Sequence, residues 1–191
     1  MALPLTQSTV LDAVNFILTM SGNNPVSSLS KDRTDVVSKA EDALHWASRE
    51  VQSFGLRGNS EKCYPLKPNI DKRIPLASNI LKVSNPSIRC VQRGSYLFNT
   101  SVSPGTDKFT ETVYADVIFF LPFEQLSQTA KTYIMIKAAR QFQAKIKSSE
   151  VIHQLTELDE YMAQAALFDE EINDENIFTA SDTLWVYHYR R

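Results

Sequence analysis

The chain has few residues arranged for catalysis or metal binding. Its three histidines, His45, His153 and His188, lie on separate segments without the His-x-x-x-His or Glu-x-x-His spacing of a metal site. The two cysteines, Cys63 and Cys90, match no metal-ligand spacing, and we expect free thiols rather than a disulfide. No Gly-x-Ser-x-Gly turn and no phosphate-binding glycine loop occurs. The sequence therefore predicts no catalytic residue, no metal and no cofactor.

Acidic residues between positions 150 and 182 leave one enzymatic alternative open. This segment contains no Lys or Arg. Two carboxyl groups roughly 5–10 Å apart, one of them in an apolar pocket, can hydrolyse a glycosidic bond. On that interpretation the protein degrades glycan or peptidoglycan. On the other, these residues form the solvated face of an amphipathic helix. The carboxylates concerned are Glu157, Asp159, Glu160, Asp169, Glu170 and Glu171.

Basic residues gather on the preceding segment, where Lys131, Lys137, Arg140, Lys145 and Lys147 occur without an acidic residue. They form either a solvated helix face or a surface that pairs with acidic residues of a neighbouring subunit, where such charges set orientation. Arg140 is the strongest candidate because its guanidinium can bind a carboxylate through two hydrogen bonds. For a subunit–subunit interface we predict Lys131, Lys137, Arg140, Glu157 and Glu160.

A helix over about 124–147 has to position these basic residues. Its apolar residues recur at three- and four-residue steps, which places them on one helix face. Met135, Ile136 and Ala139 widen the apolar surface, so this helix needs more than one partner helix. We expect it to be the central helix of a bundle. The residues of the stripe are Leu126, Ala130, Tyr133, Ile134, Ala138, Phe142 and Ile146.

Three further helices are expected, at about 8–22, 32–54 and 150–171. Ser8 is the expected N-cap of the first, and glycines at 22 and 55 end the first two. Trp46 is expected to pack inward, as helix aromatics usually do. In the last helix the residues expected to face the core are Val151, Leu155, Leu158, Met162, Ala165 and Ala166.

Residues 56–121 change to short apolar runs separated by Pro, Gly, Asn and Ser, a pattern that predicts antiparallel strands. Arg93-Gly94-Ser95 is the expected turn of a hairpin. The expected strands are Lys62–Leu66, Ile74–Leu76, Ile80–Val83, Ile88–Val91, Tyr96–Asn99 and Thr112–Leu121. The predicted fold class is α+β: an antiparallel bundle of about four helices at 1–55 and 122–171, an inserted small antiparallel β-sandwich or barrel at 56–121, and an extended C-terminal tail at 172–191.

The composition bounds the class of protein. With 191 residues, 43% of them hydrophobic, the chain can bury a core, and its net charge of −2 gives no global reason to bind nucleic acid. Residues 1–9 lack the basic start and apolar run of a secretory signal, and no run of about 18 apolar residues occurs. We therefore expect neither a signal peptide nor a membrane span.

The C-terminal segment places large aromatic residues on alternate positions and ends in two arginines. Aromatic residues and arginine commonly anchor interfaces. Such a segment could add as a strand to another chain's sheet or lie in a groove, or it could form a last strand on this chain's own β domain. The residues concerned are Trp185, Tyr187, Tyr189, Arg190 and Arg191.

Three short motifs resemble one family, the podophage tail tubular protein A family. Residues 21–29, SGNNPVSSL, resemble the GxxPVxxL turn after its first helix. Residues 48–55, SREVQSFG, resemble the end of its second helix, although Leu56 follows where the family usually has an aromatic residue. Residues 138–142, AARQF, resemble a motif of its third helix. The order of two helices, a β insert and two helices also matches, so the resemblance covers about residues 8–170.

The resemblance implies a structural, non-enzymatic adaptor of the virion tail, made in the host cytoplasm. Members form a twelve-subunit ring that joins the portal to the tail nozzle, of tubular protein B type, and DNA passes through without sequence-specific binding. The bundle would lie near the portal and the β domain near the nozzle and tail fibres. The terminal aromatics and arginines then become candidates for portal binding. Acidic residues facing the channel would repel phosphates, and the candidates are Asp169, Glu170 and Glu171.

Overall fold

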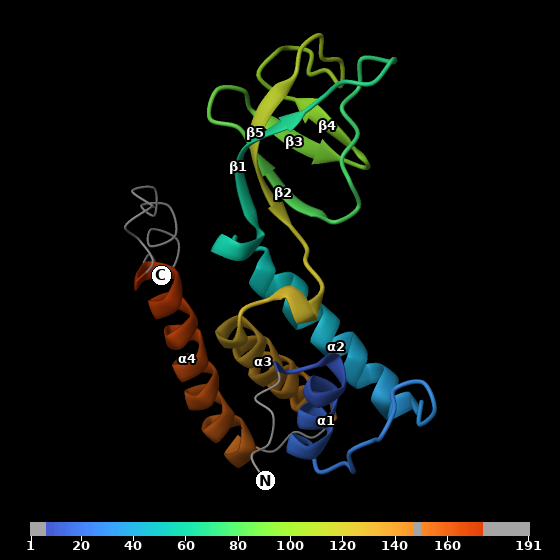
Figure 1. Ribbon diagram of the computed structural model, residues 1–191, viewed down its shortest axis with the longest axis vertical. Helices are drawn as coiled ribbons and strands as arrows, with labels where there is room; N and C mark the ends of the chain where they lie inside the picture. Colours follow the sequence, from blue (N-terminus) through green and yellow to red (C-terminus); the bar gives the residue numbers. More distant parts are fainter. Residues whose placement is uncertain (1–6, 147–149, 174–191) are drawn as a thin grey trace.

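A β domain projects from one end of a four-helix bundle in the computed structural model, which describes residues 7–146 and 150–173 (Figure 1). The helices are α1 (Val10–Met20), α2 (Asp35–Gln52), α3 (Gln128–Ile146) and α4 (Glu150–Asn173). The strands β1 to β5 all lie between α2 and α3 in the sequence. The chain therefore has the expected α+β architecture of four helices with small antiparallel sheets.

Helix starts are set by side-chain caps. Thr9, and not Ser8, caps α1: its hydroxyl accepts a hydrogen bond from the Asp12 amide at 3.2 Å, and the Asp12 carboxylate accepts one from the Thr9 amide at 2.9 Å. The bonds from Thr9 lower the pKa of Asp12. α2 starts at Asp35, later than predicted, because the Asp32 carboxylate instead closes the preceding turn by accepting hydrogen bonds from Ser27 and Ser28.

α3 is the central helix of the bundle, as predicted. It packs against α1, α2 and α4, and the described side chains of its predicted stripe are buried. It begins at Gln128 rather than near 124 because residues Phe123–Gln125 form a separate 3-10 turn, η2, and the Ser127 hydroxyl accepts a hydrogen bond from the Ala130 amide. The surrounding core comes from all four helices and includes Val14, Ile17, Leu44, Val51, Ile134, Phe142 and Leu167.

Two expectations about the bundle surface are wrong. Trp46 does not pack inward: 63% of it is exposed, because it lies on the opposite side of α2 from the buried residues Ala40, Leu44 and Val51. In α4, the predicted inward residues Leu158 and Met162 are exposed, and so is Ala166. The expected inward positions at 151 and 155 lie outside the described side chains.

The β domain contains two antiparallel sheets around a second core. β5 (Val113–Phe119) lies between β1 (Ser60–Leu66) and β2 (Ile80–Ser84), and β3 (Cys90–Arg93) pairs with β4 (Tyr96–Asn99). Gly94, at φ +61°, makes the predicted hairpin turn between β3 and β4. Residues 74–76 do not form the predicted strand; Pro75, which has no N–H, makes one isolated bridge to Tyr96. The core residues are Leu66, Ile74, Leu76, Ile80, Leu97, Phe109, Val113, Ala115 and Val117.

Candidate functional site

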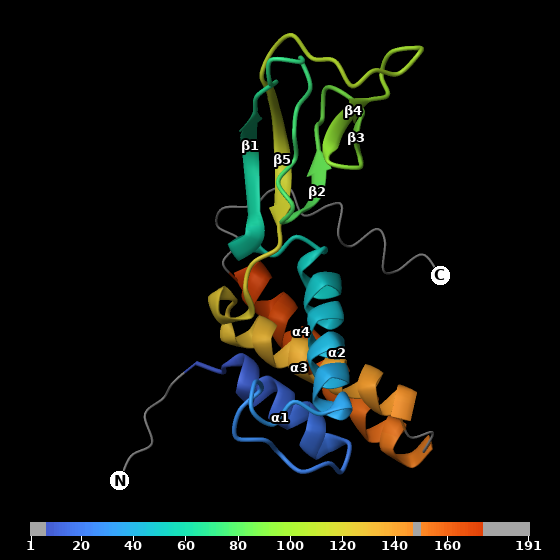
Figure 2. The ribbon, with the colours of Figure 1, turned by 90° about the vertical axis from the view of Figure 1, so that its right-hand side faces the viewer.

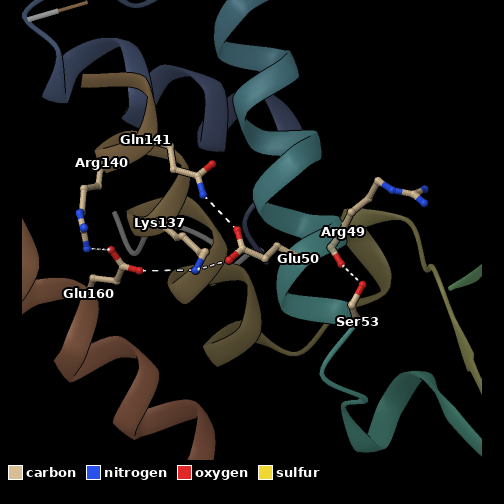
Figure 3. A network of polar contacts seen from close by, with 7 residues as sticks. All are labelled: Arg49, Glu50, Ser53, Lys137, Arg140, Gln141 and Glu160. Carbon is tan, nitrogen blue, oxygen red and sulfur yellow. Dashed lines mark hydrogen bonds and ion pairs between the residues drawn. The ribbon is translucent and has the colours of Figure 1, made fainter. Parts of the chain in front are cut away.

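A network of ion pairs joins α2, α3 and α4 on one side of the bundle (Figure 3). The Lys137 ammonium lies 3.0 Å from the Glu50 carboxylate and 3.7 Å from that of Glu160. The Arg140 guanidinium donates to Glu160 at 2.7 Å and lies 3.5 Å from Glu157. Lys137 is half-buried, so these pairs link three helices at a site with limited solvent screening.

The network shifts the pKa of its central base. Burial alone would lower the pKa of Lys137, but the hydrogen bond to Glu50 and the charges of Tyr133, Glu50 and Glu160 outweigh it and raise the pKa. Burial also raises the pKa of the neighbouring Tyr133 hydroxyl, against the effect of Lys137. The folded chain therefore holds both protons at neutral pH.

Four of the five residues predicted for a subunit–subunit interface thus meet inside one chain: Lys137, Arg140, Glu157 and Glu160. The fifth, Lys131, lies apart from them and is fully buried (0% exposed). Its ammonium donates to the Gln7 side chain at 2.9 Å and to the Glu124 carbonyl at 3.0 Å. In the folded chain, Lys131 therefore has no exposed surface that could contact another subunit. A role between subunits stays a prediction for the other four.

Two buried amides fix the junction between the bundle and the β domain. Gln52, at the end of α2, accepts a hydrogen bond from the Leu121 amide at 2.7 Å and donates to the Leu121 carbonyl at 3.0 Å. Asn59 donates to the carbonyls of Gln52 (3.0 Å) and Phe119 (2.8 Å). Between them the chain turns at Gly55, where φ is +84° and a Cβ would lie 2.9 Å from Ile118. The segments that enter and leave the β domain are therefore held side by side.

The C-terminal end of α4 also reaches this junction. Glu171 accepts a hydrogen bond from the Arg57 amide at 2.8 Å, and Glu170 accepts one from the Ser127 hydroxyl at 3.2 Å. Both carboxylates line a pocket of about 340 Å³ between the two domains. Asp169 is exposed beside them. The predicted channel-facing residues thus lie together, and two of them hold α4 to the junction; whether they face a channel stays a prediction.

An apolar groove runs between α1, α3 and α4 on another side of the bundle. Its volume is about 470 Å³, and its lining is Phe16, Met20, Thr132, Ile136, Ala139, Asp159, Met162 and Ala163. Beside it, α4 exposes Leu158 (60%), Tyr161 (68%) and Met162 (62%). The groove was not predicted from the sequence, because Leu158 and Met162 were expected to face the core. The available signal was that α4 carries apolar residues on more than one face.

Across residues 7–146 and 150–173, no group of three or more His, Cys, Asp or Glu side chains is placed to hold a metal. Cys63 is an exposed free thiol; Cys90 is half-buried, and burial raises its pKa. Within these ranges no helix has the length and apolar character needed to cross a membrane. The predicted portal-binding residues, Trp185, Tyr187, Tyr189, Arg190 and Arg191, lie outside the described residues.

Comparison with known proteins supports the resemblance seen in the motifs. The family model described as tail tubular protein matches residues 11–177, from the first helix to beyond the end of α4. No curated protein matches the chain. The family match covers both halves of the bundle and the whole β domain, so it includes the junction, the ion-pair network and the groove. The chain belongs to the tail tubular protein family and is a structural component of a phage tail.

Proposed function

We propose that this protein is the adaptor of a short-tailed phage: a ring of about twelve subunits that joins the portal to the tail nozzle and continues the DNA channel. The observation that carries the proposal is the family match across an α+β chain whose β domain projects from one end of the bundle. Such a subunit offers two different ends to two different partners. In this arrangement the bundle meets the portal, and the β domain meets the nozzle of tubular protein B type and the tail fibres.

The junction supports the same function. An adaptor has to keep its two ends at a fixed spacing and angle while DNA passes. Gln52 and Asn59 bond both connecting segments to each other and to α2, and Glu171 adds α4 to the junction. The mechanism is therefore geometric and non-enzymatic. The charge fits this role, because an acidic cluster at 169–171 and a net charge of −2 do not hold DNA phosphates.

Light scattering on the purified chain, alone and after mixing with assembled portal rings, tests this function. We expect the mass of the portal plus about twelve subunits after mixing. A chain that stays monomeric and does not bind the portal would overturn the proposal.

A variant lacking residues 176–191 tests the role of the terminal aromatic residues separately. We expect its far-UV circular dichroism to be unchanged and its portal binding to be lost. Full binding by that variant would remove Trp185, Tyr187 and Tyr189 as portal contacts.

A further inference from the structure

α2 and α4 lie on opposite sides of α3 (Figures 1 and 2). Each has exposed apolar residues: Trp46 on α2, and Leu158, Tyr161 and Met162 on α4. α2 contacts α3 near Gln141, whose side chain donates to Glu50 at 3.1 Å. The groove uses Thr132 of α3, nine residues or about two and a half turns earlier, and hence the opposite helix face. The exposed Trp46 and the groove are therefore on opposite flanks of the bundle.

The two flanks differ in shape. On α2, Trp46 projects from the solvent face as a single large aromatic side chain, 63% exposed. On the other flank, Phe16, Ile136 and Met162 line a concave apolar groove of about 470 Å³. A projecting indole and an apolar groove are complementary in both shape and chemistry, and tryptophan is among the residue types that most often dominate binding energy.

This pair of surfaces favours a second copy of the same chain as the occupant. A contact between different patches on opposite flanks is head-to-tail, and head-to-tail contacts generate rings when the rotation closes. A different partner would need only one of the two surfaces. One indole buries roughly 150–250 Å², well short of the ~800 Å² per partner of a standard interface. Leu158 and Tyr161 are exposed on α4 next to the groove residues Asp159 and Met162, and they add apolar surface to the contact.

Resting on the proposed ring function, we infer that Trp46 of each subunit inserts into the groove between α1, α3 and α4 of the next subunit. The contact buries the indole against Phe16, Met20 and Met162. It also covers the outer face of α4, where Leu158, Tyr161 and Met162 are exposed among the described residues. The ion-pair network holds α4 at the side of the groove, since Arg140 and Lys137 fix Glu160 on the inner face of that helix.

Disulfide trapping between two singly substituted chains tests the contact. Both chains carry Cys63→Ser and Cys90→Ser; one also carries Trp46→Cys and the other Met162→Cys. The two are mixed and oxidised, with and without portal rings, and run on a non-reducing gel. We expect a covalent dimer from the mixture and none from either chain alone. The matched control replaces Trp46→Cys by Ile70→Cys, a fully exposed apolar position of the β domain, and should give no dimer.

The outcomes separate this contact from the adaptor function. If subunits assemble on the portal but the mixture gives no dimer under either condition, the contact is overturned and the adaptor function stands. A dimer without portal binding supports the contact and overturns the adaptor function. If there is neither a dimer nor portal binding, both the contact and the adaptor function are overturned.

Alanine variants without oxidation give a second test of the contact. Trp46→Ala should weaken subunit assembly at least ~30-fold with unchanged circular dichroism, whereas Ile70→Ala should assemble normally. Equal assembly by the two variants would also overturn the contact.

Discussion

α2 and α4 both pack against α3, yet they use their apolar residues differently. α2 buries eight of its 18 residues against the rest of the chain. In α4, Leu167 is the one buried residue among the described side chains at 157–172, while Leu158, Tyr161 and Met162 face solvent. α2 is thus a helix that holds the fold of its own chain. α4 is held mainly by its contact with α3 and by polar contacts at its inner face, which leaves its apolar surface available for assembly.

Leucine truncation on the two helices should give the largest contrast. Leu44→Ala on α2 removes a buried side chain and leaves a cavity, so we expect the free energy of unfolding to fall by about 2–5 kcal/mol. Leu158→Ala on α4 removes the same side chain from an exposed site and should change stability by less than ~0.5 kcal/mol. Urea unfolding of both variants measures the difference. Similar losses in the two variants would show that the outer face of α4 is buried in solution and break the comparison.

The C-terminal ends of the two helices allow a second contrast, of intermediate size. Gln52→Ala leaves both backbone groups of the half-buried Leu121 without their side-chain partner, and we expect a loss of about 1–3 kcal/mol. Glu171→Ala removes a hydrogen bond to the exposed Arg57 amide and should cost less than ~1 kcal/mol. Thermal unfolding followed by circular dichroism compares them. If Glu171→Ala is the costlier change, α4 rather than α2 is the main support of the junction.

The smallest expected effect is a pH dependence of the network that joins α2 to α4. The pKa of Lys137 is raised above its ordinary value of 10.5, and that of Tyr133 above 10.0. Above about pH 10 the folded chain still holds these protons, whereas the unfolded chain releases them. Their stabilising contribution is therefore complete below pH 10 and is lost as the pH rises through the folded pKa values.

Denaturant unfolding of the parent chain and of a Tyr133→Phe, Lys137→Met double variant, between pH 8 and 11, isolates this contribution from the other lysines and tyrosines. We expect the parent to lose more stability than the variant over that range. Parallel pH profiles would mean that the network does not couple the titration of these two groups to folding.

The central helix, α3, was predictable because several apolar residues in a row repeat the same helical spacing. Ala130, Ile134, Ala138 and Phe142 repeat at four-residue steps and are all buried. The β hairpin at Gly94 was predictable for a similar reason: a turn signal flanked by two apolar runs is a local pattern. In both cases, residues close in sequence carry all the information that the structure uses.

The orientation of α4 and the position of Trp46 were not predictable in this way. The spacing of apolar residues shows that a helix has an apolar face. Where apolar residues occur on two faces of a helix, the spacing does not show which face packs against the rest of the chain. In α4 the orientation of the helix is set by Glu160, because its carboxylate forms ion pairs with Lys137 and Arg140, some twenty residues earlier in the sequence. The bond between Gln52 and Leu121 spans 69 residues and has no local signal. The groove depends on these long-range contacts, so no local sequence pattern predicts it.

The junction also bears on how such proteins diversify. The chain leaves the bundle after α2 and returns before η2, and the hydrogen bond from Asn59 to Phe119 places the two crossing points next to each other. Because exit and return are adjacent, the bundle can close with little regard to what is inserted there. The β domain is thus an insertion that could be exchanged for another domain, in evolution or by engineering, while the helical bundle keeps its fold.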